Sequence, residues 1–272
     1  MAMHPRVSVS QICFMGQPLA EAAAHWRAIG PGHIGLISPP LLTDGIAPIQ
    51  AVIAEGGYGI ETIAHMFSMG QLSRDEAAWQ KPRAELNAII DMAAALGARS
   101  IYGLTGGRGA MPWEVAAECF RDMIAPCLAR AGAAGVKLMI ECATPLYAHG
   151  TISNNLHDTL TLAEIAGTGV CVDTFGCWTE AGLRDLIARA VGLGALIQVS
   201  DYVPGDTALP CRAVPGDGAI PLRDMLNWSL EAGYAGAFDI ELLGPRIEAE
   251  GRFEATRRAA EKVSELLVSL GA

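Results

Sequence analysis

The second half of the chain reads VKLMIEC at residues 136–142, GVCVDTF at 169–175, ALIQVSDY at 195–202 and GAFDIELL at 236–243. Each run is short and apolar, which is typical of a buried strand. Each also carries an oxygen-bearing side chain near its carboxyl end, namely Glu141, Asp173, Gln198 and Glu241. These four residues lie 25 to 43 positions apart, about the length of one strand and one helix. Because the carboxyl ends of parallel strands meet at one edge, the pattern predicts that the four side chains converge.

The same alternation of strands and helices extends through the whole chain. Four earlier strands are predicted at 6–14, 33–38, 59–67 and 100–106. Ala-rich helices are predicted at 18–29, 44–55, 74–97, 113–134, 155–166, 179–192, 221–232 and 253–270. Eight strand–helix units in 272 residues predict an α/β protein, a single (β/α)8 TIM barrel in one domain over residues 1–272. A doubly wound open sheet is less well supported, because the segment after the first strand lacks a GxGxxG phosphate turn.

Composition and charge exclude several classes of function. A hydrophobic content of 51% with only 18% charged residues supports a sizeable core and argues against disorder. The formal net charge of −10 disfavours nucleic acid as a partner, including abasic DNA as a nuclease substrate. The seven Cys residues show no CxxC spacing, and no signal peptide or membrane span is recognisable. We therefore expect a soluble, cytoplasmic protein with reduced thiols, no membrane partner and a helical exterior compatible with a homo-oligomer.

The four converging residues predict a metal site. Three carboxylates at one point need a counter-charge, and a divalent cation is the simplest one. The oxygen donors Glu141, Asp173, Gln198 and Glu241 favour Mn²⁺ or Mg²⁺, with Co²⁺ as a substitute, whereas Zn²⁺ prefers more His ligands. No organic cofactor is expected. Glu141 and Glu241 belong to non-adjacent strands, so they are placed to flank a substrate. This arrangement suits proton transfer between neighbouring carbons through an enediolate.

The chain resembles the xylose-isomerase-like TIM barrels, often described as sugar phosphate isomerases/epimerases, over nearly its whole length. The resemblance is carried by IECA, VDTFGCW and IQVSDY around the first three donors, by RAVPGDGAI at 212–220, and by GYAGAFDIEL ending at Glu241. It implies one divalent metal on the four donors, with Glu141 and Glu241 as the acid/base pair and Arg212 as a contact to substrate oxygens. Gln198 in the third position is similar to the hydroxypyruvate-isomerase branch and to some dehydratases.

Two positions depart from the family pattern. Members frequently carry His three residues after the Asp, where this chain has Gly176. Sugar epimerases tend to place an acid six residues after the first Glu, where this chain has Tyr147. The metal site is thus expected to be retained while the residues that face the substrate are changed. A simple ketohexose epimerase is disfavoured, which leaves a dehydratase, a lyase or an isomerase of a less polar substrate.

Four further polar residues are candidate substrate contacts: His65 at the end of the third strand, His149 in the loop after the fifth, Asp201 after the seventh, and Arg212. Each has a structural alternative. His65 can form its hydrogen bonds with other groups of the protein interior, and His149 can be a solvent-exposed loop residue. The aspartate can cap the following loop, and the arginine can form an ion pair within its own loop.

The predicted function is a divalent-metal-dependent isomerase or epimerase of a small keto or polyhydroxy substrate. A metal-dependent lyase or dehydratase is the alternative, because both reactions begin by removing a proton next to a polarised carbonyl. A third possibility is a barrel that has lost catalysis and only binds a metabolite.

Overall fold

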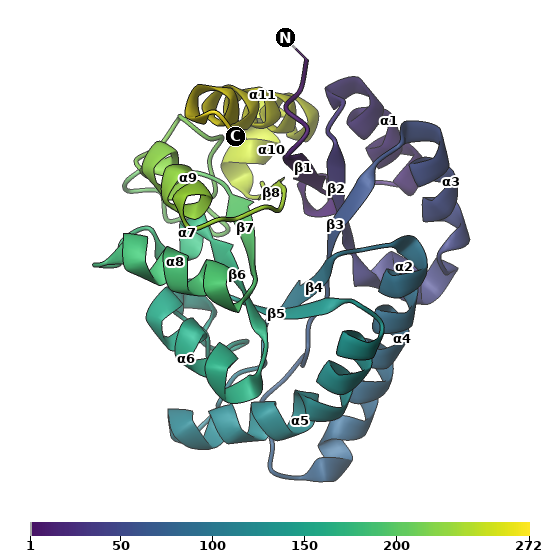
Figure 1. Cartoon of the computed structure of the whole chain (residues 1–272), viewed down its shortest axis with the longest axis vertical. Coiled ribbons are helices and arrows are strands. Elements are labelled where there is room, and N and C mark those ends of the chain that lie inside the picture. The colour runs from purple at the N-terminus through teal and green to yellow at the C-terminus, as the bar shows by residue number, and fades with distance from the viewer. Residues whose placement is uncertain (1) are drawn as a thin grey trace.

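The computed structural model describes residues 2–272, which form a closed barrel of eight parallel strands surrounded by helices (Figure 1). The strands pair in chain order, and β1 closes the barrel against β8. They are β1 (Val7–Ser10), β2 (His33–Ile37), β3 (Gly59–Ala64), β4 (Ser100–Gly103), β5 (Lys137–Glu141), β6 (Gly169–Asp173), β7 (Ala195–Val199) and β8 (Phe238–Ile240). The predicted (β/α)8 architecture is confirmed.

The eight predicted helices are all present. They are α1 (Leu19–Ile29), α3 (Ala47–Gly56), α4 (Gln80–Leu96), α5 (Trp113–Ala133), α6 (Leu156–Ala166), α8 (Leu183–Leu193), α9 (Leu222–Glu231) and α11 (Arg252–Leu270). The third predicted helix was placed too early: α4 begins at Gln80, so that Pro82 falls in its first turn, where a missing N–H costs little. In the described part of the chain, no helix is long and apolar enough to cross a membrane.

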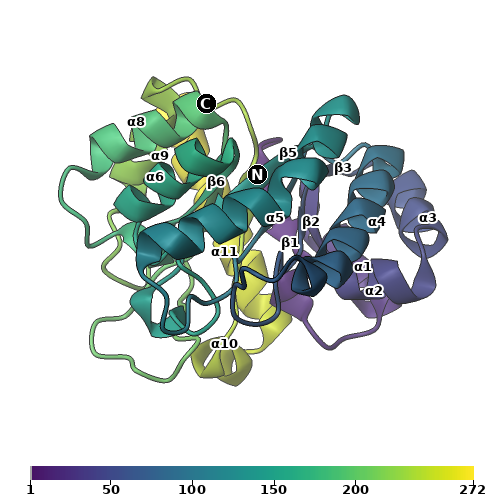
Figure 2. The ribbon, with the colours of Figure 1, turned by 90° about the horizontal axis from the view of Figure 1, so that it is seen from below.

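Three short helices lie at the carboxyl ends of strands: α2 (Ser38–Asp44) after β2, α7 (Thr174–Cys177) after β6, and α10 (Pro245–Glu250) after β8. The sequence did not predict them. The segment SPPLLTD of α2 contains two prolines, and the other two helices are too short to show a period. Figure 2 shows α2 and α10 toward the lower side of the barrel, the side to which the long loop after β7 also extends.

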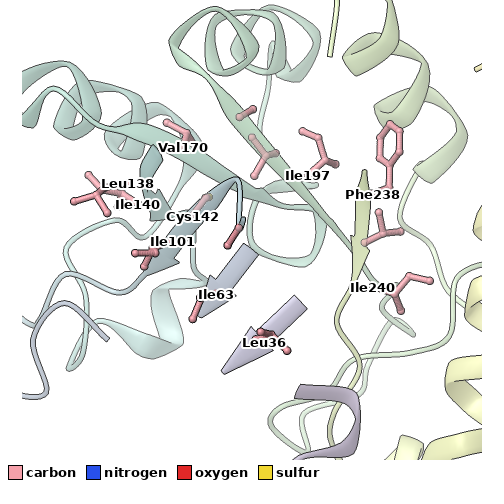
Figure 3. Close-up of a cluster of buried hydrophobic side chains, with 14 of the residues drawn as sticks. Leu36, Ile63, Ile101, Leu138, Ile140, Cys142, Val170, Ile197, Phe238 and Ile240 are labelled. Carbon is pink, nitrogen blue, oxygen red and sulfur yellow. The ribbon is translucent and has the colours of Figure 1, made fainter. Parts of the chain in front are cut away.

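The main core lies between the barrel and its helices. Apolar strand side chains form one buried cluster with helix residues such as Ile90 of α4 and Phe120 of α5. Figure 3 shows the strand side of this cluster: Leu36, Ile63, Ile101, Leu138, Ile140, Cys142, Val170, Ile197, Phe238 and Ile240. Successive strand residues point to opposite faces, so the residues between these positions face the inside of the barrel.

The inside of the barrel is partly polar. The Ser8 hydroxyl donates a hydrogen bond of 2.6 Å to Oδ1 of the fully buried Asp239. A Cβ atom at Gly35 would lie 3.0 Å from that oxygen, so the glycine leaves room for the carboxyl group. The other oxygen, Oδ2, has no hydrogen-bond partner among the described residues. Burial raises the pKa of Asp239 from 3.8 to about 8, so the group is mostly protonated at neutral pH.

We expect Asp239→Asn to change how stability depends on pH. The wild type loses stability as pH rises from 3.8 toward about 8, because the unfolded chain ionises first. Integrated between roughly pH 5 and pH 8, the loss is on the order of 3 kcal/mol. The asparagine does not titrate. The free energy of unfolding of Asp239→Asn, minus that of the wild type, should therefore increase by on the order of 3 kcal/mol between pH 5 and pH 8. Urea unfolding at several pH values measures the difference, and parallel profiles for the two proteins would contradict it.

Candidate active site

The structure brings the four predicted oxygen donors to the carboxyl end of the barrel. Glu141 and Asp173 are the last residues of β5 and β6, and Glu241 directly follows β8. The pairing of β6 with β7 sets Asp173 beside Gln198. Gln198 Nε2 then donates to Glu241 Oε2 at 2.5 Å. Strand register alone therefore explains why residues from four parts of the sequence meet.

Arg212, from the loop after β7, joins two of the carboxylates. Its Nη1 and Nη2 atoms donate to the two oxygens of Asp173 at 2.9 and 2.8 Å, and Nη2 lies 3.0 Å from Glu241 Oε1. The guanidinium is buried and lies over the ring of Phe175, with 5.0 Å between Cζ and the ring centroid. The partners of Arg212 are thus barrel acids. The alternative of an ion pair within its own loop is wrong.

Glu241 has three side-chain partners. Besides Gln198 and Arg212, the hydroxyl of Tyr102 donates to its Oε2 at 2.9 Å. Burial raises the pKa of Glu241, and Arg212 opposes that shift. Sequence reasoning did not assign a polar role to Tyr102. Its position at the end of β4, facing the same lumen, was the only available signal.

Glu141 differs from the other two acids because no side-chain hydrogen bond to it is formed in residues 2–272. Only its backbone carbonyl is engaged, as the acceptor of the Ser153 hydroxyl. Burial raises the pKa of the carboxyl group well above its usual value, and the nearby charges of Glu241 and Asp173 raise it further. Glu141 is therefore a carboxyl group with a high proton affinity and an open side.

The charges at the site do not balance. Three carboxylates face one guanidinium, which leaves two negative charges without a partner when all are ionised. Within residues 2–272, no three His, Cys, Asp or Glu side chains are grouped closely enough to hold one ion as they stand. Arg212 occupies the oxygens of Asp173 and Glu241, and Gln198 turns its amide nitrogen toward Glu241.

A cavity of about 630 Å³ opens beside these acids. Glu141, Glu241 and Tyr102 form its inner end, while the segments that follow β1 to β4 supply the other walls. His65, at the end of β3, also lines it. Its Nδ1 lies 2.9 Å from Ser38 Oγ, and burial lowers its pKa to about 4, so the ring is neutral at pH 7.

The structure does not place three of the four candidate substrate contacts along this cavity: Arg212, which pairs with Asp173 and Glu241 instead, and Asp201 and His149. Asp201 is buried, and its two oxygens accept four backbone N–H bonds, from Tyr202, Gly216, Gly218 and Ile220. It therefore shapes the loop that carries Arg212. His149 is exposed, with its ring 6.4 Å from that of Tyr147. Neither residue lines the cavity, whereas His65 does.

Gly176 has a structural reason for lacking a side chain. A Cβ atom there would lie 2.3 Å from the carbonyl oxygen of Cys142, which immediately follows β5. The close approach of α7 to this backbone leaves no room for the histidine that the family resemblance led us to expect. The departure from the family pattern is therefore built into the packing of the β5 and β6 ends.

We expect Gly176→Ala to destabilise the protein by about 1–3 kcal/mol, the usual cost of forcing extra atoms into packed surroundings. Gly192 in α8 is the matched control, because a Cβ there meets nothing within 4 Å. Gly192→Ala should leave stability unchanged or raise it by about 0.4–1 kcal/mol. Chemical denaturation of both variants provides the comparison. Equal stability of Gly176→Ala and the wild type would contradict the prediction, because it would show that the backbone around Cys142 can move to accept the Cβ atom.

Comparison with known proteins gives a consistent picture. A family model described as "Xylose isomerase-like TIM barrel" matches residues 19–266. No protein of curated function matches the chain. Among solved structures, the protein SMc04130 from Sinorhizobium meliloti 1021 is 24% identical with a TM-score of 0.83, and the match covers 96% of this chain and 98% of that one.

Two other structures are similar in fold at lower identity. The IolI protein "with a binding zinc atom" is 15% identical with a TM-score of 0.80, covering 97% of this chain and 98% of that one. A D-psicose 3-epimerase with D-tagatose from Clostridium cellulolyticum H10 is 15% identical with a TM-score of 0.78, again covering 97% and 98%. At these identities the likeness supports the shared barrel.

Proposed function

The chain belongs to the xylose isomerase-like TIM barrel family, and from that premise we propose that it is a divalent-metal-dependent isomerase or epimerase of a small keto or hydroxy-keto compound. The observation that carries the proposal is the pair Glu141 and Glu241. Both line one cavity, and they come from β5 and the end of β8, which are separated by two strands of the barrel. Two carboxyl groups that flank one substrate can remove a proton and return one.

The residues present fit a divalent cation in chemistry and charge. Glu141, Asp173, Gln198 and Glu241 are the oxygen donors that would hold it, and two positive charges would neutralise the two that Arg212 leaves unbalanced. Rotation of the Gln198 amide, whose oxygen and nitrogen are interchangeable in shape, would turn its oxygen to the donor set. The bound ion would polarise the substrate carbonyl and stabilise negative charge on its oxygen. Mn²⁺ and Mg²⁺ are the ions that such a set prefers.

The protein's own groups divide the proton transfers between them. Glu141 has no side-chain partner to give up and a raised pKa, so it is suited to accept the proton from the carbon next to the carbonyl. Glu241 accepts hydrogen bonds from Tyr102 and Gln198, and the Tyr102 hydroxyl would still hold its carboxyl group once the Gln198 amide turned toward a cation. Glu241 is suited to return a proton on the other side of the substrate. Arg212 pairs with both Asp173 and Glu241 and so fixes the two carboxyl groups relative to each other.

A lyase or dehydratase remains the alternative, since it would use the same first step and differ only in the loss of a β-hydroxyl. Incubation of the Mn²⁺-loaded protein with hydroxy-ketones in D₂O distinguishes the two. Deuterium incorporation with retention of all hydroxyl groups supports the isomerase. Loss of water supports the lyase. No exchange with any hydroxy-ketone, by a protein with bound metal, would contradict both.

We expect Glu141→Gln and Glu241→Gln each to lower the rate of deuterium exchange by about 10²–10⁴-fold, the usual contribution of a general acid or base. Both variants keep the shape of the side chain while removing its ability to carry a proton. Glu118→Gln, on the exposed face of α5, is the matched control and should exchange at the wild-type rate. Proton NMR measures the exchange. Wild-type rates in both active-site variants would disprove the assignment.

A second prediction tests the ion without relying on activity. Arg212→Met leaves Asp173 and Glu241 buried and unpaired, so the metal-free variant should be about 3–5 kcal/mol less stable than the wild type. Because its site is more negative, saturating Mn²⁺ should stabilise this variant more than the wild type. Glu141→Gln should respond less than the wild type. Thermal unfolding with Mn²⁺ or a chelator measures these shifts, and no response to Mn²⁺ in any of the three proteins would contradict the metal site.

A further inference from the structure

The cavity beside the two glutamates has one charged end and one largely apolar body. Its wall outside the acids comes from the ends of β2 to β4 and from the segments that follow β1 to β4, α2 among them. The apolar part is formed by Ile12, Ile37, Pro39, Pro40, Met66 and Leu104. A sugar places a hydroxyl on almost every carbon, and each hydroxyl buried against these side chains would lose its hydrogen bonds to water without replacement.

Most polar groups of the wall are already engaged or lie at the solvent mouth. The Ser38 hydroxyl faces His65, and the Tyr102 hydroxyl donates to Glu241. The Thr43 hydroxyl is turned to backbone carbonyls of its own helix, and both Thr43 and Asp44 are exposed. Away from the charged end, these contacts leave little with which a polyhydroxy compound could be recognised.

His65 is the exception within the apolar wall. Only 6% of it is exposed, and its Nε2 has no hydrogen-bond partner in the described part of the chain. Buried ring nitrogens are normally paired, so this atom is suited to one polar group of a ligand. Ser38 at Nδ1 sets the tautomer: when the hydroxyl donates to Nδ1, Nε2 carries the hydrogen and is a donor.

We propose that the substrate is an α-hydroxy ketone with a mainly hydrocarbon body that bears a single hydrogen-bonding substituent. The hydroxy-keto head lies against Glu141 and Glu241, the body lies along the apolar wall, and the substituent pairs with His65 Nε2. This inference rests on the proposed proton-transfer function and narrows its substrate class. The proposed substrate differs from the sugar-like substrate that the family resemblance implies. The protein would recognise it by burying its hydrocarbon body and by one polar contact.

The test is a substrate series with the Mn²⁺-loaded protein in D₂O. The series runs from 1-hydroxy-2-propanone to 1-hydroxy-2-hexanone, with D-fructose as the polyhydroxy comparison. Burial of each CH₂ is worth about 0.8 kcal/mol, so kcat/KM for deuterium exchange should rise about fourfold per added carbon. 1-Hydroxy-2-hexanone should exceed D-fructose at least tenfold. A flat series, or D-fructose as the better substrate, would overturn the proposal.

The polar contact has its own test. Three isomers of dihydroxy-2-hexanone, with the second hydroxyl at carbon 4, 5 or 6, are compared with 1-hydroxy-2-hexanone. In the wild type, at least one isomer should match or exceed the parent compound, and His65→Phe should lower that ratio about tenfold. His157→Phe, exposed on α6, should leave the ratio unchanged. An unchanged ratio in both His65→Phe and His65→Gln would refute the contact.

Binding separates failure of this inference from failure of the proposed function. Calorimetric titration of the same ketones measures affinity even if no exchange occurs. Affinity that rises with chain length supports the apolar pocket, and the absence of exchange then counts against the catalytic role alone. Exchange that is fastest with D-fructose would support the catalytic role and disprove the apolar substrate. Affinity that does not depend on chain length would disprove the apolar substrate, whether or not exchange occurs.

Discussion

The carboxyl end of this barrel depends on one electrostatic constraint: two buried carboxylates and a third, partly buried one lie near a single guanidinium. Asp173 and Glu241 are held on either side of Arg212, and Glu141 is left without a side-chain partner. In a medium of low polarity such an excess of negative charge is costly, so it is relieved by taking up protons or a cation. Both responses are what a metal-dependent proton-transfer site requires. The imbalance therefore supports the proposed function.

The barrel produces this arrangement through strand alternation. Apolar residues on the outer face pack against the helices (Figure 3). The inner face carries Ser8, Tyr102, Cys171 and Asp239. Asp239 lies two residues before Glu241 and faces the same lumen, where it is kept mostly protonated at neutral pH. The protein thus bears the cost of polar groups inside the barrel, while most of its stability derives from the layer between strands and helices.

The sequence predicted the strand-end residues well because register and alternation are local properties. Glu141, Asp173, Gln198 and Glu241 could be identified from period and position alone. The partners of Arg212 could not be predicted, because they depend on the fold of the loop after β7. Asp201 fixes that loop by accepting hydrogen bonds from backbone N–H groups as far along the chain as Ile220. The apolar cavity was not predictable for a similar reason. One of its walls is α2, a proline-containing segment without a recognisable period.

The apolar wall and the charged end act on each other. Glu141 lies at the end of the apolar wall, and its burial there is the largest cause of its raised pKa. The side chains that would select the substrate therefore also increase the proton affinity of the group that would act as base. A more polar wall, suited to a sugar, would solvate that carboxyl group and weaken the effect. Since one set of residues would govern both properties, a change of substrate class in this barrel should be accompanied by a change in the basicity of Glu141.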